Sequence, residues 1–419
     1  MRKTVPVQRP AFMVSPQARV EDAAARFRQA MAAADFPVAR QCCEEVLRVM
    51  PHNMQVLSDY ALALMRVGEY QKSWKTYQKI YQATADKRAQ AAETWLDGLT
   101  EVCGWLNKPY EVARYGLESL QQSDRKFSAG QKHPLPAEAP PTFAASRPQE
   151  NIIAFSLYGD QPRYCETLIK NVEVARELYP AWTCRIWLDD SVPQHVWQRL
   201  AQPNVQLVDM SHEKTLFPTL WRFLVMDDAS VKRFIVRDAD SLLSERELAA
   251  VEAWLQSPYW FHHMRDYFTH TELLLAGMWG GCNGVFSNIE QQMRDFITRY
   301  QGSERFTDQY FLKLALWPTV RESLLSHDDI FHFHQAEAWP AHDPIRWQTD
   351  RFHVGSNAGF SSMAGKASHA DAAMQQVELT YGDQSWCYPA KVRGGEWALP
   401  MPFFLIDAWK AGELTVQAL

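Results

Sequence analysis

The chain has 419 residues, a hydrophobic content of 47% and a formal net charge of −6. This length predicts two or three domains, and the modest negative charge gives no general attraction to nucleic acid or to an anionic membrane. The seven cysteines show neither CxxC pairs nor the spacing of a disulfide framework, which favours reduced thiols. No secretory signal or transmembrane segment is expected, so the predicted location is the cytoplasm.

Residues 1–19 are expected to form an N-terminal extension, and residues 20–122 a helical domain with an internal repeat. Asp35-Phe36 and Glu69-Tyr70 are 34 residues apart, and small or aromatic residues recur at matching offsets around them. A helical period of this length is typical of tetratricopeptide repeats (TPR), and the region resembles that family. A plain helical bundle is the alternative. Because stacked helix pairs usually bind proteins, a protein partner is possible for this region.

Residues 123–150 are rich in proline, which predicts a linker or an extended wrap. From residue 151 onward, apolar strands alternate with amphipathic helices. This alternation predicts an α/β domain with a doubly wound, mostly parallel sheet, and the domain is assigned to residues 151–419, including a C-terminal extension. The expected strands are 152–157, 183–188, 205–208 and 231–236, and the expected helices are 164–179, 193–200, 216–226 and 245–255.

Two acidic residues, Asp238 and Asp240, come directly after the strand that begins near Val231. Ligands of open α/β sheets bind beyond the carboxyl ends of the strands. Two carboxylates at such a strand end suit Mg²⁺ or Mn²⁺, and these ions usually share their coordination with substrate phosphates. The pattern therefore predicts a divalent metal that holds a nucleoside diphosphate sugar, although an Asp-x-Asp pair in a solvated turn is common.

Residues 151–360 resemble nucleotide-sugar glycosyltransferases of the A fold (GT-A), especially the retaining galactosyl- and glucosyltransferase families related to glycogenin. The resemblance rests on the order of short matches along the chain. The matching segments are Phe155-Ser156-Leu157, Trp221-Arg222-Phe223, Arg237-Asp238-Ala239-Asp240-Ser241, Ala276-Gly277-Met278-Trp279-Gly280-Gly281, Asp308-Gln309 and His353-Val354-Gly355-Ser356.

The resemblance implies a metal site built from Asp238, Asp240 and His353. Asp240 would be a direct ligand, and Asp238 would bind the metal, the ribose hydroxyl or both. A histidine ligand would favour Mn²⁺ over Mg²⁺; a structural His353 beside a Gly turn is the alternative. The family usually continues after this histidine with a Lys-Pro-Trp signature, whereas here Asn357 follows Ser356.

The resemblance also implies contacts to the donor. The Arg222 guanidinium would neutralise the diphosphate; a surface salt bridge is the alternative. A tight turn is the alternative for the small-residue segment. The implied donor-binding residues are Phe155, Ser156, Leu157, Arg222, Asp238, Ala239, Gly280, Gly281 and Asn283.

Asp308 and Asp266 are the candidate catalytic carboxylates. Thr307 as a helix cap, with Asp308 in the first turn, explains the same residues without catalysis. A second group of candidate metal ligands is His332, His334 and His342, because 331–334 alternates like a strand with two histidines on one face.

The expected activity is transfer of a hexose from a nucleoside diphosphate sugar, a UDP-sugar by preference, to a hydroxyl of a glycan, a lipid or a protein, with retention of configuration. Two alternatives stay open. The chain could be a catalytically inactive TPR adaptor, or it could be a metal-dependent nucleotidyltransferase on a similar sheet.

Overall fold

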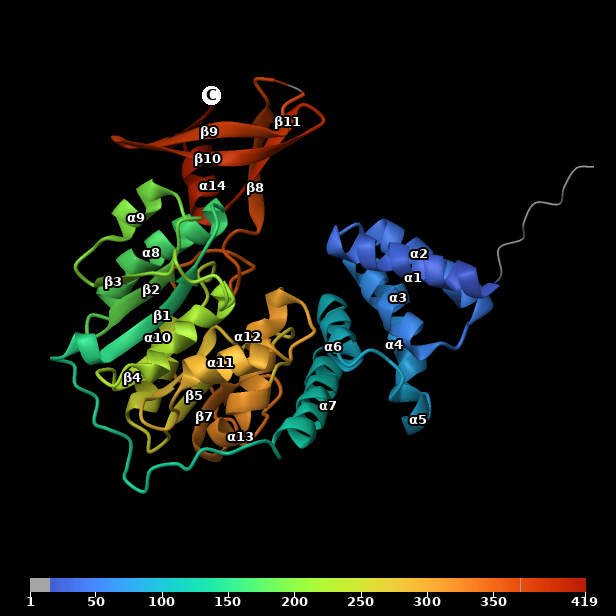
Figure 1. Ribbon diagram of the computed structural model, residues 1–419, viewed down its shortest axis with the longest axis horizontal. Coiled ribbons are helices and arrows are strands. Elements are labelled where there is room, and N and C mark those ends of the chain that lie inside the picture. Colours follow the sequence, from blue (N-terminus) through green and yellow to red (C-terminus); the bar gives the residue numbers. More distant parts are fainter. Residues whose placement is uncertain (1–15, 370) are drawn as a thin grey trace, which may run out of the picture. The chain divides into compact units, whose positions relative to one another are not determined.

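The computed structural model describes residues 16–369 and 371–419 and divides the chain into two compact units, 1–119 and 120–419 (Figure 1). Each unit has its own core. The predicted N-terminal extension lies outside the described residues up to position 15, and residues 16–19 already belong to the first helix.

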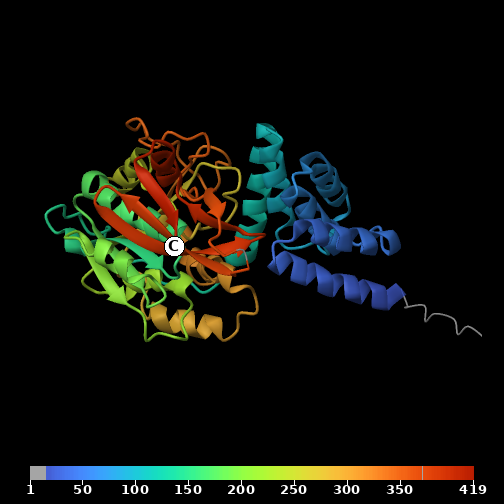
Figure 2. The ribbon, with the colours of Figure 1, turned by 90° about the horizontal axis from the view of Figure 1, so that it is seen from above.

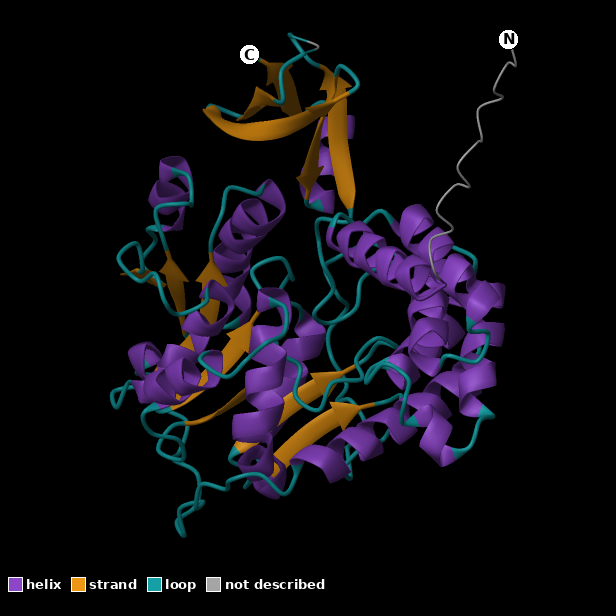
Figure 3. Ribbon diagram, turned by 45° about the vertical axis from the view of Figure 1, so that its right-hand side comes forward, coloured by secondary structure: helices purple, strands orange, loops and turns teal. Residues whose placement is uncertain are grey.

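In its described part, the first unit consists of helices joined by short loops (Figure 3). Its small side chains let the helices approach closely, and Ala39 and Ala63 are fully buried in the core. The second and fourth helices begin at Phe36 and Tyr70, so the period expected from the sequence coincides with real helix starts. The helices are α1 (Pro16–Ala32), α2 (Phe36–Val49), α3 (Met54–Arg66), α4 (Tyr70–Tyr81), α5 (Ala85–Arg88), α6 (Trp95–Trp105) and α7 (Pro109–Phe127).

Helix α7 continues through the position where the linker was expected to begin, so residues 123–127 are helical. The residues that follow run as an extended wrap over the second unit. The His133 amide donates to Thr319 Oγ1 at 2.8 Å, and Arg233 Nη2 donates to the Pro141 carbonyl at 2.8 Å. Proline suits this segment because it disfavours regular hydrogen-bonded structure.

The second unit is a mixed α/β fold around a seven-stranded sheet of order β3-β2-β1-β4-β6-β5-β7. The sheet is mostly parallel; β6 alone runs antiparallel to both of its neighbours. The predicted mostly parallel α/β sheet is therefore confirmed. The strands are β1 (Asn151–Leu157), β2 (Thr183–Leu188), β3 (Val205–Asp209), β4 (Arg233–Arg237), β5 (Phe261–Arg265), β6 (Met278–Cys282) and β7 (Leu324–Asp328).

The strand order reverses at β1, because β2 and β3 extend to one side of it and β4 lies on the other. Such a switch point opens a crevice beyond the carboxyl ends of the two central strands. The helices of this unit are α8 (Pro162–Leu178), α9 (Gln194–Leu200), α10 (Glu245–Leu255), α11 (Ile289–Ile297), α12 (Thr307–Phe311), α13 (Trp317–Val320) and α14 (Phe403–Lys410), with a 3₁₀ helix η2 (Pro218–Asp227) before β4.

The predicted strand at residues 331–334 is wrong. The backbone φ angles of His332 and His334 are 50° and 59°, so the chain turns there instead of extending. The cause is the buried Asp328 carboxylate, which accepts hydrogen bonds from the amides of Phe331 and Phe333 at 2.8 and 3.2 Å. The two histidines consequently do not share a strand face.

Residues 361–419, called here the C-terminal module, form a second, antiparallel sheet of order β12-β9-β10-β11-β8 with helix α14 beside it (Figure 2). Its buried Tyr388 donates a hydrogen bond to Glu166 Oε1 on α8 at 2.7 Å. Among the described residues, no helix has the length and apolar character needed to cross a membrane. The strands are β8 (Ser361–Lys366), β9 (Met374–Tyr381), β10 (Gln384–Arg393), β11 (Glu396–Met401) and β12 (Leu414–Ala418).

Candidate active site

Asp238 and Asp240 lie at the carboxyl end of β4, beside the switch point. The Asp238 side chain is 40% exposed, so it is open to a ligand. Burial, and then the charge of the neighbouring Asp238, raise the pKa of Asp240 to about 6, while Arg163 and Arg222 act in the opposite direction. A like charge nearby disfavours the ionised form of a carboxyl group, and burial acts in the same direction.

Arg222 is the centre of a buried ionic network at this site. Its Nη1 donates to Asp238 Oδ1 at 2.5 Å, and its Nη2 donates to Asp308 Oδ2 at 2.9 Å. Its side chain is only 5% exposed, so the alternative of a surface salt bridge is wrong. The Arg222 amide donates to Ser156 Oγ at 3.0 Å, which ties η2 to β1. Residues from β1, η2, β4 and α12 thus meet at one point.

Asp308 is buried in the first turn of α12. Burial raises its pKa, and the charge of Arg222 offsets part of that rise. Its Oδ1 accepts a hydrogen bond from the Gln309 amide at 2.8 Å. The N-cap residue of α12 is Phe306, and Thr307 is already helical, so Thr307 does not have the capping role that was the alternative explanation.

The backbone before β6 packs against one side of Asp238. A Cβ on Gly277 would lie 2.0 Å from Asp238 Oδ2, so only glycine fits this approach. The Gln309 side-chain amide, in the orientation that satisfies both of its polar atoms, donates to the Leu274 carbonyl at 3.0 Å and accepts from the Ala276 amide at 3.1 Å. The Asp308-Gln309 pair is therefore hydrogen-bonded to the backbone at the start of the small-residue segment.

Arg163 and Tyr158 are site residues that the sequence analysis missed. Tyr158 follows β1 and is 44% exposed, and Arg163 lies in the first turn of α8, where its charge opposes the raised pKa of Asp240. Arg163 also donates to the Tyr164 hydroxyl. The available signal was Gly159 followed by Pro162, which marks a helix N-terminus directly after the first strand.

Several of the predicted donor-binding residues have buried side chains or lie away from the two acids. The Phe155, Leu157 and Ala239 side chains are buried in the core. Gly280 and Gly281 are inside strand β6, where added Cβ atoms would strike the Phe234 carbonyl oxygen at 2.5 Å and the Phe261 ring at 2.6 Å, so they are neither a turn nor a ligand loop. Because β6 is antiparallel, Asn283 lies at the opposite end of β4, where its amide donates to the Lys232 carbonyl at 3.0 Å.

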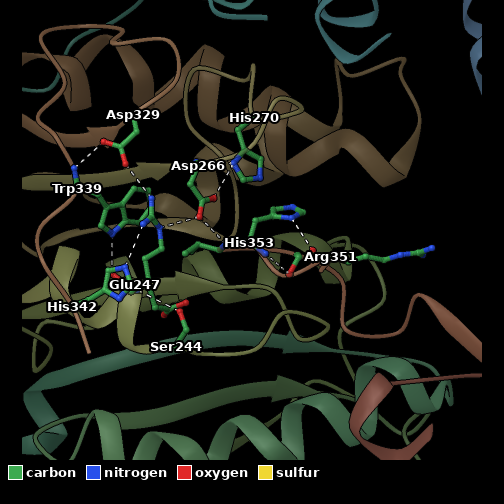
Figure 4. A network of polar contacts seen from close by, with 12 residues as sticks. Ser244, Glu247, Asp266, His270, Asp329, Trp339, His342, Arg351 and His353 are labelled. Atoms are coloured by element: carbon green, nitrogen blue, oxygen red, sulfur yellow. Dashed lines mark hydrogen bonds and ion pairs between the residues drawn. The ribbon is translucent and has the colours of Figure 1, made fainter. Parts of the chain in front are cut away.

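Asp266 and His353 lie together in a separate polar network beyond β5 (Figure 4). Asp266 Oδ2 accepts a hydrogen bond from the Val354 amide at 3.1 Å and is 3.3 Å from Arg246 Nε. His353 stacks on Tyr267, with ring centroids 3.7 Å apart. Burial raises the pKa of Asp266 to about 6 and lowers that of His353 to about 4. His353 thus has the character of a half-buried, neutral imidazole.

The donor set at the switch point fits a metal that is shared with a substrate. Within residues 16–369 and 371–419, no group of three or more His, Cys, Asp or Glu side chains is arranged to hold a metal ion. Neither the predicted triad with His353 nor the cluster of His332, His334 and His342 is therefore present as a preformed site. Asp238 and Asp240 alone offer two carboxylates, which suits Mg²⁺ or Mn²⁺ when phosphates and water complete the shell.

The fold and site define a mixed α/β domain with a charged site at a switch point, following a region of helical repeats. No protein-family model matches the chain, and no curated protein matches it. One similar solved structure is a mutant of the O-GlcNAc transferase of Thermobaculum terrenum, 13% identical, covering 54% of this chain and 46% of that one with a TM-score of 0.27. The chain spans less than half of that protein, and a superposition at this TM-score defines neither a shared fold nor a shared activity.

Proposed function

We propose that the chain is a glycosyltransferase of the GT-A type that transfers a hexose from a nucleoside diphosphate sugar, a UDP-sugar by preference, to a hydroxyl acceptor on a glycan, a lipid or a protein. The observation that carries this proposal is the network in which buried Arg222 joins Asp238 and Asp308 at the sheet's switch point. The positive charge of Arg222 lies between the carboxylates of Asp238 and Asp308. This arrangement suits a ligand that has both a negatively charged diphosphate and sugar hydroxyl groups.

Asp238 and Asp240 would hold Mn²⁺ or Mg²⁺, which as a Lewis acid supplies stabilisation of the departing diphosphate. Arg222 fixes Asp238 in one orientation and keeps a positive charge beside it. Arg163, at the N-terminal turn of α8, adds a second positive charge on the side of Asp240. These charges are already in position when negative charge develops on the leaving diphosphate. Such preorganised electrostatic stabilisation is usually the largest contribution to catalysis.

Asp308 shares the Arg222 guanidinium with Asp238, which supports a place for it beside the proposed donor site. We assign it the role of orienting the transferred sugar. Asp266, in the network beyond β5, stays the second candidate for a proton exchange with the acceptor hydroxyl. The proposed transfer retains the configuration of the sugar, as the resemblance to the retaining glycosyltransferase families implies.

The test is a screen of UDP-, GDP- and ADP-sugars for Mn²⁺-dependent release of nucleoside diphosphate, with products identified by mass. Wild type should release the diphosphate from one donor, and Asp240→Asn should lose at least about 100-fold of that rate because half of the carboxylate pair is gone. Release of pyrophosphate with a nucleotidyl adduct would instead favour the nucleotidyltransferase. A rate that Asp240→Asn leaves unchanged would overturn the proposal.

An inactive adaptor is the second candidate, and one observation favours it. Arg222 already neutralises Asp238, and no third protein ligand joins the carboxylate pair within the described residues. If the chain is an adaptor, its helical repeats would recruit the same protein partners in wild type and in Asp240→Asn. Co-purification of both forms from the native host, analysed by mass spectrometry, identifies the partners. The phenotype of the Asp240→Asn strain then separates the two candidates, because an adaptor should keep both its partners and its phenotype, whereas an enzyme should lose the phenotype.

A further inference from the structure

The segment 353–360, called here the crossing segment, runs along the carboxyl edge of the large sheet from β5 to β4. At one end the Val354 amide donates to Asp266 Oδ2 at 3.1 Å. At the other end the Ala358 amide donates to the Asp240 carbonyl at 2.8 Å, and Asn357 pairs with Ser241 in an isolated antiparallel bridge. The crossing segment therefore contacts both the loop after β5, which contains Asp266, and the loop after β4, which contains Asp240.

The C-terminal module holds the crossing segment from the other side. The Phe403 amide donates to the Ala358 carbonyl at 2.9 Å, so the Ala358 residue is bonded to Asp240 through its amide and to the module through its carbonyl. The Phe360 and Phe403 rings stack with centroids 5.9 Å apart. Ala358 itself is 3% exposed, which protects both of these hydrogen bonds from water.

Gly359 brings the crossing segment against Arg163. A Cβ on Gly359 would lie 2.3 Å from Arg163 Cβ, a distance that no pair of side chains tolerates. The Gly359 φ is not in the left-handed region, so the close approach, and not backbone geometry, requires glycine here. One short segment thus contacts both the backbone of Asp240 and the side chain of Arg163.

We propose that the crossing segment positions Asp240 and Arg163, that Gly359 and Phe403 are positioning residues of the site, and that the role of the C-terminal module is to hold this segment in place. The chemistry at the site rests on the proposed function, whereas the positioning rests on the contacts alone. The module would then influence ligand affinity at the switch point without touching the ligand.

The experiment compares Gly359→Ala with Gly365→Ala in the full chain. Gly365 lies in β8, where an added Cβ would meet the Trp397 ring at 2.8 Å, so this control introduces a clash inside the module without changing the contacts of Phe403 with Ala358 and Phe360. Hydrogen exchange is followed by mass spectrometry over residues 236–244. Gly359→Ala should speed exchange there by about tenfold with residues 183–188 unchanged, and Gly365→Ala should leave both regions as in wild type.

The second readout is calorimetric binding of MnCl₂ together with UDP. The affinity should fall by about 10- to 100-fold in Gly359→Ala, which is the usual effect of changing a residue that supports a metal ligand. It should stay at the wild-type value in Gly365→Ala. Phe403→Ala, which removes the ring stacked on Phe360, should weaken binding in the same direction, and it substitutes if Gly359→Ala does not fold.

Three results would overturn the positioning role. They are exchange over 236–244 that matches wild type, equal effects of the two glycine variants, or faster exchange with unchanged affinity for Mn²⁺ and UDP. If wild type itself does not bind Mn²⁺ and UDP, the proposed function fails, and the exchange measurements still decide whether the crossing segment restrains the Asp240 loop.

Discussion

The Arg222 guanidinium donates to the carboxylate of Asp308, 86 residues further along the chain, at 2.9 Å in the buried part of the site. Its second nitrogen reaches Asp238, so one planar side chain holds two acids from different elements. Because a guanidinium has a fixed fork of donors, this arrangement sets both carboxylates in place before a ligand arrives.

Replacing Arg222 should destabilise the fold. Arg222→Met leaves Asp308 buried without its countercharge, so the free energy of unfolding should fall by about 3 kcal/mol. Arg222→Lys keeps the positive charge but loses the fork of donors. Its free energy of unfolding should therefore lie between those of Arg222→Met and wild type. Urea unfolding followed by far-UV circular dichroism measures both. A stability for Arg222→Met equal to that of wild type would show that the ion pairs contribute nothing net.

Gly277→Ala should displace Asp238, because the new Cβ would lie 2.0 Å from Asp238 Oδ2. We expect a loss of about 1–3 kcal/mol from overpacking, together with weaker Mn²⁺ binding in the presence of UDP. Ala276→Gly next to it adds no atom and serves as the control for loop flexibility. Thermal unfolding and calorimetry report the two effects. Unchanged metal affinity in Gly277→Ala would mean that Asp238 is not a ligand.

The pH dependence of stability should carry a contribution from Asp266, whose side chain is only 7% exposed. Its pKa of about 6 in the folded protein is above the ordinary value for aspartate, so the folded state binds the proton more tightly. This contribution is fully present below about pH 4 and is lost as the pH rises through about 6.

Wild type should therefore lose about 2 kcal/mol relative to Asp266→Asn when the pH is raised from 4 to 7. Denaturant unfolding of both proteins at several pH values gives the difference directly, because titrations common to both proteins cancel. A difference that stays constant with pH would contradict the raised pKa of Asp266.

Tyr388→Phe should loosen the attachment of the C-terminal module to α8. The hydroxyl donates to Glu166 Oε1 at 2.7 Å in the interior, and its removal should cost about 1–2 kcal/mol. Tyr381→Phe, whose ring is 45% exposed, should change stability by less than about 0.5 kcal/mol. Differential scanning calorimetry compares the two. Equal melting temperatures of Tyr388→Phe and Tyr381→Phe would show that apolar packing, and not this hydrogen bond, stabilises the attachment.

Local pattern was sufficient for the first four strands of the second unit, for two helix starts of the first unit and for one part of the site. The alternation of apolar runs and amphipathic segments located β1, β2, β3 and β4 to within two residues at each end, and the strand ending placed Asp238 and Asp240 at the carboxyl edge. The 34-residue offset located the starts of α2 and α4. These features depend on side-chain periodicity within a few turns or one strand, which a sequence displays directly.

The tertiary structure decided which of the other candidates meet these two acids. Arg222 and Asp308 join them, whereas Asn283 is carried to the far end of β4 because β6 runs antiparallel, and His353 is carried to Asp266. Arg163 enters the site because α8 begins beside the strand end. The first four strands of the second unit and the acidic pair could be predicted from the sequence alone, since both are local features. Strand direction and long-range ion pairs arise from packing between distant segments, which no local pattern encodes.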